Sequence, residues 1–292
     1  MKSLLDLLHK KKRLISDGAW GTQLQNKGLP VGTAPELWNV DNPKAVIAVA
    51  EEYAKAGSDI VLTNTFGGSR IKLNKEKLGH RVEELNIVGA KNSCIGAPDC
   101  FIAASVGPTG EMPEPYGDLE IEAFDETFQE QISCLAEGGA NGFCIETMSG
   151  LEEAESAVRA ARKIAPALEV ILTFTFNRTS RGFFTMMGVS PEQAARSAEE
   201  WGVDIVGANC GNGIEAMVEI AAQMRMATSK PILIHANAGV PELIQGKTVF
   251  RQKPSDFAAG AKRLFDEGVS IIGGCCGTTP EHIAAIKSVI QD

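Results

Sequence analysis

Short runs of apolar, largely β-branched residues alternate along the chain with longer segments whose apolar positions recur every three or four residues. The short runs predict buried strands, and the longer segments predict amphipathic helices. The strand pattern occurs in eight runs, at residues 13–16, 59–63, 101–106, 142–146, 170–175, 204–208, 231–235 and 269–272. The helical pattern occurs between them, for example at residues 43–56, 121–138, 151–164, 191–201, 214–227 and 254–268.

Eight strands that alternate with helices predict an α/β fold of the (β/α)8 TIM barrel type, in one domain over residues 1–292. Several joints repeat one signature, in which a glycine follows the helix and the next residues enter a strand, as at residues 56–60, 138–142, 201–205 and 267–271. Glycine is a common residue at helix ends. A doubly wound open sheet is the alternative, but it would not bring the eighth run back beside the first.

Composition narrows the range of partners and compartments. The net charge of -9 and the pI near 5.1 argue against a nucleic-acid-binding protein, because no basic stripe is available to neutralise phosphates. No apolar stretch is long enough to span a bilayer, and no cleavage site follows the leucines of residues 4–8. Seven cysteines without paired spacing suit a reducing compartment. We therefore expect a cytoplasmic protein that binds neither nucleic acid nor membrane.

Polar residues and glycines follow every predicted strand. They occupy residues 17–22, 64–68, 107–111, 146–147, 177–178, 209–210, 237–239 and 275–276. In a TIM barrel the loops after the strands meet at one end of the barrel and build the active site there. The sequence therefore predicts an active site at this rim.

Three cysteines lie among glycines at two of these strand ends: Cys210 after the sixth run, and Cys275 and Cys276 after the eighth. Neighbouring side chains on a strand point to opposite faces, so Cys275 and Cys276 can share a ligand only where the backbone leaves the strand. Three thiolates and an open fourth position are typical of a zinc site that performs chemistry. A vicinal redox pair is the alternative, although its ring would be strained. The remaining cysteines are predicted to pack as small hydrophobes, at positions Cys94, Cys100, Cys134 and Cys144.

The chain resembles the homocysteine S-methyltransferase family over essentially its whole length. It resembles the homocysteine-binding module of cobalamin-dependent methionine synthase and, more distantly, betaine-homocysteine methyltransferase. The resemblance rests on residues 17–22, 63–67, 107–111, 209–210, 237–239 and 273–280. The Gly-Gly-Cys-Cys-Gly element with its separate Asn-Cys is the most specific part. His235-Ala236 before Asn237 departs from the proline-led form expected in the family.

This resemblance implies that zinc activates homocysteine as a thiolate, which is then methylated to methionine. It implies that Asp17 and Glu146 lie near the substrate amino group, and that Asn237 supplies the fourth zinc ligand before substrate binds. Backbone N–H groups of glycine-rich loops, such as the one at Gly18, can take the substrate carboxylate. Thr65 and Asn209 complete the substrate-binding set that we expect.

Thiol activation also follows from the cysteines alone. A thiolate is the nucleophilic form of sulfur, and metal coordination removes the thiol proton at neutral pH. Hydrolysis is a weaker interpretation, because hydrolytic zinc sites more often use histidine and carboxylate ligands.

The sequence leaves the methyl donor open. A separate methyl-corrinoid protein can dock at the rim, or a small donor such as S-methylmethionine or betaine can enter directly. A small cationic donor would favour an aromatic cage. The alternative function is a thiol-binding methyltransferase subunit that works only with the methyl-corrinoid protein.

Overall fold

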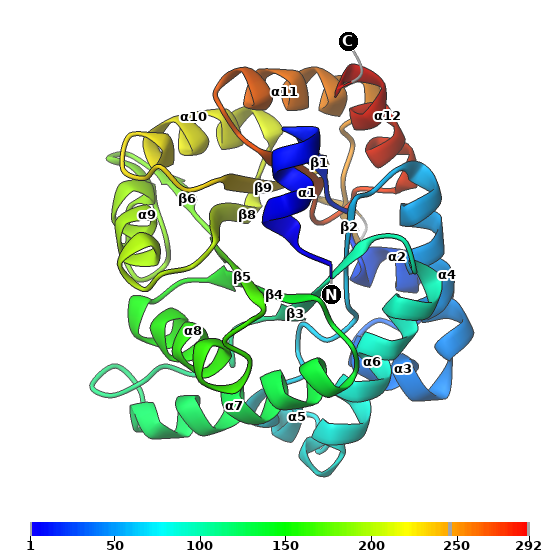
Figure 1. The fold of residues 1–292 in the computed structure, drawn as a ribbon, viewed down its shortest axis with the longest axis vertical. Coiled ribbons are helices and arrows are strands. Elements are labelled where there is room, and N and C mark those ends of the chain that lie inside the picture. Colours follow the sequence, from blue (N-terminus) through cyan, green and yellow to red (C-terminus); the bar gives the residue numbers. More distant parts are fainter. Residues whose placement is uncertain (1, 245–246, 291–292) are drawn as a thin grey trace.

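The computed structural model describes residues 2–244 and 247–290. Eight parallel strands form a ring with helices outside it (Figure 1). The strands are β1 (Leu14–Ile15), β2 (Ile60–Leu62), β3 (Phe101–Val106), β4 (Gly142–Met148), β5 (Glu169–Phe174), β8 (Ile205–Gly213), β9 (Ile232–Asn237) and β12 (Ile271–Gly274).

The ring closes between the first and last of these strands. The strand order is β1-β12-β9-β8-β5-β4-β3-β2, and β1 pairs with β12 in parallel. A single parallel bridge between Ser16 and Ile60 joins β1 to β2 and completes the circle. The predicted (β/α)8 barrel is thus confirmed, and the doubly wound open sheet is excluded because the eighth strand lies beside the first.

A helix follows each strand of the ring. These helices are α4 (Pro43–Ala56), α6 (Val82–Gly96), α7 (Ile121–Glu137), α8 (Leu151–Ile164), α9 (Pro191–Glu200), α10 (Ile214–Arg225), α11 (Pro254–Asp266) and α12 (Pro280–Ile290). Their ends follow local chemistry: α9 begins after Ser190, whose hydroxyl accepts a hydrogen bond from Gln193 N at 3.2 Å. Helix α4 ends at Gly57, which has a φ of 110° that favours glycine. None of the helices in the described ranges is both long enough and apolar enough to cross a membrane.

Shorter elements occupy the connections. They are α1 (Leu4–Lys11), α2 (Gly21–Asn26), η1 (Pro35–Leu37), α3 (Trp38–Asp41), α5 (Arg70–Lys75), η2 (Gly79–Arg81) and two hairpins, β6 (Asn177–Thr179) with β7 (Gly182–Phe184) and β10 (Glu242–Ile244) with β11 (Lys247–Val249). Both hairpins lie in loops that follow strands, and therefore at the rim where the sequence places the site.

The inside of the barrel is apolar at its N-terminal end. Each strand contributes one residue to a buried layer, namely Leu14, Ile60, Phe101, Cys144, Ile171, Ile205, Leu233 and Ile271. Helix α1 lies across this end of the ring (Figure 1), and its fully buried Leu4 belongs to the same cluster. Burying a side chain of this size contributes about 1.5–3 kcal/mol to the stability of the fold. The layer fills one end of the barrel, which leaves the other end for chemistry.

The four cysteines that we expected to pack in the core differ in exposure. Cys100, Cys134 and Cys144 are buried, in agreement with that prediction. Cys94 is only half-buried, at the surface of α6, where its thiol contacts the carbonyl oxygen of Gly139 at 3.4 Å.

Candidate functional site

The inward faces of the strands change from apolar to polar towards the C-terminal end of the barrel. Residues two apart on a strand share a face, so Cys144 in the apolar layer is followed inward by Glu146. Polar residues occupy the corresponding inner positions of neighbouring strands and are also buried, at Ser105, Thr173, Asn209 and His235. The alternation of the strands therefore places a ring of polar side chains at the end opposite to α1.

The sulfur atoms of Cys210, Cys275 and Cys276 converge at this polar end. All three Sγ atoms lie within 4.8 Å of one another, and those of Cys210 and Cys276 are 3.6 Å apart. This is the only group of three or more metal-ligating side chains within residues 2–244 and 247–290. The structure thus brings together the three cysteines that the sequence singled out.

Local backbone geometry explains this convergence. Cys210 has a φ of 58°, and the register between β8 and β9 is irregular between Asn209 and Gly213. We expected Cys210 beyond the strand, whereas β8 extends to Gly213 through this irregular stretch. Cys275 and Cys276 follow β12, and Thr278 N donates to Cys275 O at 3.1 Å, which closes a turn over residues 275–278. The chain has left the strand at this point, as the sharing of one ligand requires.

Glycine is needed next to the paired cysteines. A Cβ atom on Gly274 would lie 2.2 Å from Thr278 Oγ1. Thr278 is fully buried, and its hydroxyl donates to Cys275 O at 2.7 Å and accepts from Ala19 N at 3.0 Å. Thr278 therefore fixes the loop after β12 against the loop after β1.

The three thiols polarise one another. Hydrogen bonds from Cys275 and Cys276 hold the pKa of Cys210 well below its usual value of 9.0. The hydrogen bond to Cys210 raises the pKa of Cys275 and also that of Cys276. The cluster alone therefore favours one thiolate, and the loss of all three protons requires a cation that binds thiolates.

The donor set fits a zinc ion. Zinc–sulfur bonds of about 2.3 Å in a tetrahedron place sulfur atoms about 3.8 Å apart, close to the 3.6 Å between Cys210 and Cys276. Asn237 is 3% exposed, and its Oδ1 has no hydrogen-bond partner among the described residues. The Asn237 side chain also hydrogen-bonds to Cys210, so this amide with its unpartnered oxygen is suited to the fourth position of such a site.

A cavity of about 670 Å³ opens beside the thiols. Five of the predicted site residues line it: Gly18, Glu146, Cys210, Cys275 and Cys276. The other four are buried and do not form part of its wall: Asp17, Thr65, Asn209 and Asn237. Aromatic side chains of Trp20 and Phe66 also face the cavity, and Glu36, Lys72 and Glu76 bring further charges to it.

Glu146 is a buried carboxyl group at the end of β4. It is 7% exposed and accepts a hydrogen bond from the hydroxyl of Ser105. Burial, together with the nearby charges of Asp17 and Cys210, raises its pKa from 4.5 to about 7, although the hydrogen bond from Ser105 acts in the opposite direction. No cationic side chain in the described chain forms an ion pair with it. The environment of Glu146 therefore lacks the positive charge that would stabilise its carboxylate.

Asp17 lies fully buried after β1 and is held by three donors. Leu62 N and Trp20 Nε1 donate to its Oδ2 at 2.7 and 2.8 Å, and Ser16 Oγ contacts Oδ1 at 3.3 Å. Burial raises the pKa of Asp17 to about 7 despite these donors. Asp17 thus links β1 to β2 and orients Trp20 at the cavity, and its predicted contact with substrate stays a prediction.

Thr65 and Asn209 are engaged by the protein itself. Thr65 Oγ1 donates to Ser105 O at 2.8 Å and contacts Thr63 Oγ1 at 2.5 Å. Asn209 binds the chain after Glu146, since its Oδ1 accepts from Thr147 N at 2.9 Å. The polar atoms of both side chains are used to shape the cavity.

His235 is the histidine nearest to the cysteines in the strand register, and it lines the cavity. It is 1% exposed, and burial lowers its pKa to about 4, so the ring is neutral at pH 7. Its Nε2 has no hydrogen-bond partner in the described structure. His235 therefore offers a neutral polar edge to whatever fills the cavity.

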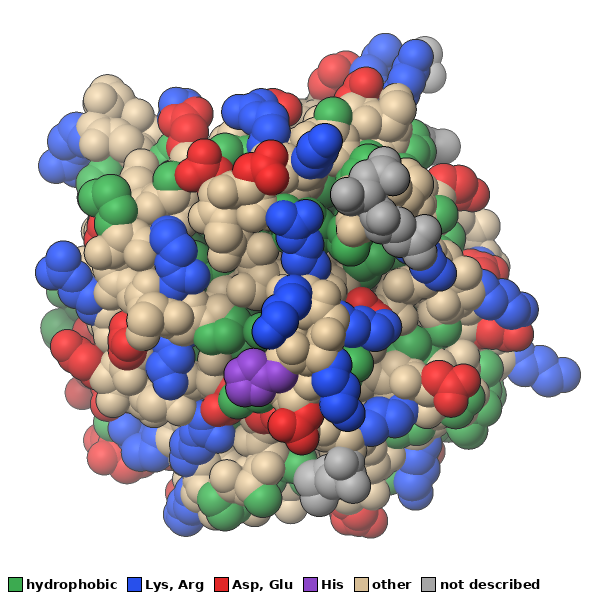
Figure 2. Space-filling view, turned by 45° about the horizontal axis from the view of Figure 1, so that its top comes forward, with side chains coloured by type: hydrophobic (Ala, Val, Ile, Leu, Met, Phe, Trp, Pro, Cys, Tyr) green, Lys and Arg blue, Asp and Glu red, His purple; other side chains and the backbone are tan. Residues whose placement is uncertain are grey.

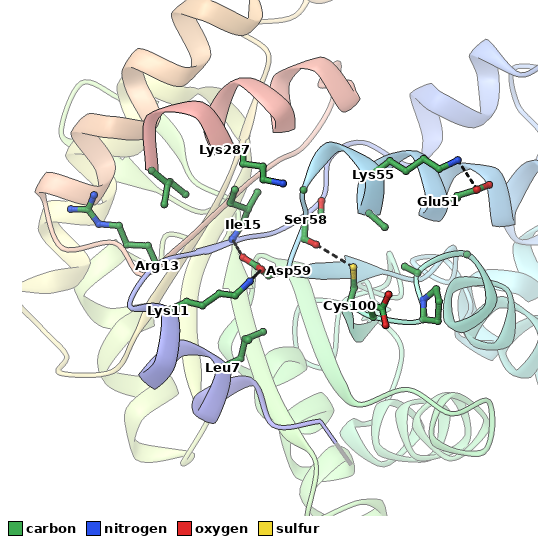
Figure 3. Close-up of a pocket in the computed structure, with 17 residues that line it drawn as sticks. Leu7, Lys11, Arg13, Ile15, Glu51, Lys55, Ser58, Asp59, Cys100 and Lys287 are labelled. Carbon is green, nitrogen blue, oxygen red and sulfur yellow. Dashed lines mark hydrogen bonds and ion pairs between the residues drawn. The ribbon is translucent and has the colours of Figure 1, made fainter. Parts of the chain in front are cut away.

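A second hollow of about 730 Å³ lies at the opposite end of the barrel, between α1, α4 and α12. Lys and Arg side chains gather near the centre of this face, with Asp and Glu side chains among them (Figure 2). Within the hollow, Lys11 pairs with Asp59 at 2.5 Å and Lys55 pairs with Glu51 at 2.6 Å (Figure 3). Because its charges largely neutralise one another, we place the functional site at the cysteine end.

The sequence did not reveal the supporting residues of the site. Ser105 donates to Glu146, Thr278 joins two rim loops, and the hydroxyl of Tyr53 donates to Ala19 O at 2.8 Å. Ser105 had a detectable signal, because it is a polar residue at an inward position of an otherwise apolar strand. Tyr53 lies on α4 among core residues, and no sequence pattern distinguishes it from them.

Comparison with known sequences identifies similar proteins over nearly the whole chain. The family model for homocysteine S-methyltransferase matches residues 14–290. Methionine synthase of Mycobacterium tuberculosis is 28% identical over 304 residues, covering 99% of this chain and 25% of that protein. Methionine synthase of Mycobacterium leprae is 27% identical over 292 residues, covering 95% of this chain and 24% of that protein. The chain thus spans about a quarter of the length of these relatives.

Solved structures share the fold. The oxidized form of the homocysteine methyltransferase MmuM from Escherichia coli has a TM-score of 0.82 and 22% identity, covering 99% of this chain and 100% of that chain. The metallated form of the same protein has a TM-score of 0.81 at 22% identity, covering 98% of this chain and 99% of that chain. At this level of identity the similarity establishes the barrel fold alone.

Proposed function

Because the chain belongs to the homocysteine S-methyltransferase family, we propose that it transfers a methyl group to the sulfur of homocysteine and releases methionine. The observation that carries this proposal is one cavity that is lined by both the three thiols and the buried carboxyl group of Glu146. We propose that the thiol and the ammonium group of one small amino acid occupy these two features at once.

The cysteine end of the cavity is proposed to hold the substrate sulfur. Cys210, Cys275 and Cys276 provide three converging sulfur ligands, and Asn237 Oδ1 supplies an oxygen that substrate can displace. Zinc bound by these thiolates would keep the substrate sulfur ionised, which is its nucleophilic form, at neutral pH. The rigid loops that Thr278 joins would then orient that sulfur towards the opening of the cavity.

The other end of the cavity is proposed to hold the amino-acid group. Burial has raised the pKa of Glu146, and an ammonium group would supply the positive charge that its carboxylate lacks. Asp17 adds a second buried acid behind this end, and the backbone at Gly18 borders the cavity where the substrate carboxylate is expected. Ala19 N is already used by Thr278, which leaves the neighbouring backbone for substrate.

Two observations bear on the methyl donor. Trp20 and Phe66 line the cavity together with the acids Glu36 and Glu76, an environment suited to a small cationic donor such as S-methylmethionine or betaine. Most large hydrophobic side chains that are exposed in the described chain lie on the loops after the strands, at Val31, Phe66, Met112, Tyr116, Met186, Val240 and Leu243. An apolar rim around a cavity suits a protein partner. The second candidate function is therefore a thiol-binding subunit that receives the methyl group from a methyl-corrinoid protein.

A methyl-transfer assay tests both candidates. The zinc-loaded protein is incubated with homocysteine and, separately, with S-methylmethionine, betaine or a methylated corrinoid protein, and methionine is measured. Turnover with a small donor contradicts dependence on a corrinoid partner, whereas turnover with the corrinoid protein alone supports it. The Cys210→Ala variant is the matched control and should be inactive with every donor. Absence of methionine in all three reactions would contradict the proposed function.

A further inference from the structure

Two residues beside the site have an unusual backbone conformation. Thr147, which follows Glu146, has a φ of 65°, and Cys210 has a φ of 58°. For a β-branched residue such as threonine this conformation is rare and unfavourable, so the surrounding structure must hold it in place. The other non-glycine residues of this kind in the described chain, Lys12 and Lys77, lie just after the short helices α1 and α5.

The side chain of Asn209 holds Thr147 in place. Its Oδ1 accepts hydrogen bonds from Thr147 N at 2.9 Å and from Thr173 Oγ1 at 2.8 Å. Its Nδ2 donates to Thr147 Oγ1 at 2.7 Å, and its backbone oxygen accepts from Thr175 Oγ1 at 2.9 Å. Asn209 is fully buried, so these contacts are shielded from water. We call Asn209, Thr147 and Thr173 the clamp.

The clamp joins strands that are not neighbours. Asn209 lies on β8 and Thr147 on β4, and β5 lies between these two strands in the ring. The register of β4 with β5 shifts between Ile145 and Met148, so Glu146 and Thr147 lie outside the regular pairing, which resumes where Met148 pairs with Phe174. Within this irregular stretch, the Asn209 side chain is what links Thr147 to β8.

Two residues of the clamp, Asn209 and Thr147, are each next to one end of the proposed substrate site. Asn209 precedes the zinc ligand Cys210, and Thr147 follows Glu146. Asn209 Nδ2 also lies 3.4 Å from Glu146 Oε2. Asn209 is not part of the cavity wall, so its effect on substrate must pass through these neighbours.

We propose that the clamp sets the distance between the sulfur-binding and ammonium-binding ends of the cavity, and thereby selects homocysteine over the shorter cysteine. This inference rests on the proposed function. In cysteine the sulfur and the nitrogen are separated by one methylene group fewer. A rigid spacing between the cysteine ligands and Glu146 lets the longer amino acid reach both ends and leaves the shorter one bound at a single end. Asn209 and Thr147 are thus positioning residues.

The test compares Asn209→Ala with wild type for zinc content, for binding of homocysteine and cysteine by calorimetry, and for methyl transfer to each thiol. A fixed site distinguishes substrates that differ by one methylene by about 10- to 200-fold. We expect Asn209→Ala to keep its zinc, to lose about 100-fold in kcat/KM for homocysteine, and to bring the homocysteine-to-cysteine ratio close to one.

Two further variants test the same spacing with smaller changes. Glycine at position 147 adopts a positive φ without strain and keeps the backbone N–H that donates to Asn209 Oδ1. The homocysteine-to-cysteine ratio of Thr147→Gly should therefore fall less than that of Asn209→Ala. Thr173→Val removes one hydroxyl donor to Asn209 and should lower the ratio by a similarly intermediate amount. If Asn209→Ala does not fold, these two variants decide the question, and unchanged ratios in both would overturn the proposal.

Asn141→Ala is the matched control. Asn141 lies just before β4, at the opposite end of the barrel, and its Oδ1 accepts a hydrogen bond from Ile102 N of β3 at 3.0 Å. Its loss should lower stability and leave the homocysteine-to-cysteine ratio unchanged. If folded Asn209→Ala retains the wild-type ratio, the clamp does not select substrate length, although homocysteine methylation would stand. Absence of thiol methylation by the wild-type protein would instead contradict the proposed function itself.

Discussion

Replacing Glu146 with glutamine should stabilise the free protein and weaken substrate binding. The pKa of Glu146 rises from 4.5 to about 7 in the folded chain, chiefly by burial. A difference of about 2.5 pKa units corresponds to about 3 kcal/mol, which is the cost of folding with this group charged. Glutamine keeps the shape and the acceptor for Ser105 but carries no charge.

The sign and the pH range follow from the raised pKa. Below pH 4.5 the carboxyl group is neutral in both the folded and the unfolded chain, and it contributes no cost. As pH rises from 4.5 to 7 the unfolded chain loses this proton first, so the free energy of unfolding falls, and the full cost is present above pH 7. Glu146→Gln should therefore raise the free energy of unfolding by about 1–3 kcal/mol at pH 8, since unfavourable contact with Asn209 offsets part of the gain. At pH 5 the gain should be below about 1 kcal/mol.

Urea unfolding of the zinc-free protein at pH 5 and pH 8 measures this difference without a contribution from metal binding. In the zinc-loaded protein, the same variant should bind homocysteine about ten- to a hundredfold more weakly, because a charge-assisted hydrogen bond of about 1.5–3 kcal/mol is lost. Glu153→Gln is the control: Glu153 is equally buried, at 7% exposure, but lies outside the cavity and should leave homocysteine affinity unchanged. Equal stability of Glu146→Gln and wild type at pH 8, or equal affinity for homocysteine, would refute the reasoning.

Substitutions at the cysteines, at Gly18 and at Asn237 test other parts of the site. Alanine in place of any one of the three clustered cysteines should remove most of the zinc, measured by metal analysis, while the circular dichroism of the barrel is retained; full metal content in all three variants would disprove the ligand assignment. Gly18→Ala should lower methyl transfer, because its Cβ would lie 2.6 Å from Thr278 Oγ1 and 2.8 Å from Tyr53 Oη, and unchanged kinetics would mean that the loop has no role. Asn237→Ala should keep zinc and bind homocysteine at least as tightly as wild type in calorimetry, since only an oxygen that substrate displaces is lost; a large loss of affinity would contradict that role.

The sequence was sufficient to predict the barrel because its strands are buried on both faces. The continuous apolar run at residues 101–106 coincides with β3, and the run at residues 170–175 is shifted by one residue from β5. A predicted glycine joint coincides with the end of α4 at Gly57. The β6–β7 hairpin was not predicted, because Asn177–Thr179 is polar and exposed, so no period of two marks it. Helix α6 was less evident than the others, since buried polar residues such as Asn86 and Asn92 interrupt its apolar face.

The chemical groups of the site were predictable from the sequence, but their geometry was not. The Gly-Gly-Cys-Cys-Gly element and the separate Asn-Cys indicated the family, which the family match confirms. The positive φ of Cys210 and the 3.6 Å between two sulfur atoms arise from an irregular strand register. Asn209 was expected to contact substrate, whereas its hydrogen bonds run to Thr147 and Thr173 on other strands. Such contacts depend on closure of the ring, and local sequence patterns do not encode them.

Direct binding of the substrate sulfur to the cysteine site is the central claim. X-ray absorption at the zinc edge counts the sulfur ligands of the zinc-loaded protein before and after homocysteine is added. Three cysteine ligands predict three sulfur atoms and one lighter ligand without substrate, and four sulfur atoms with homocysteine. A sulfur count that stays at three while homocysteine is bound would contradict the account, because the zinc would then have only a structural role.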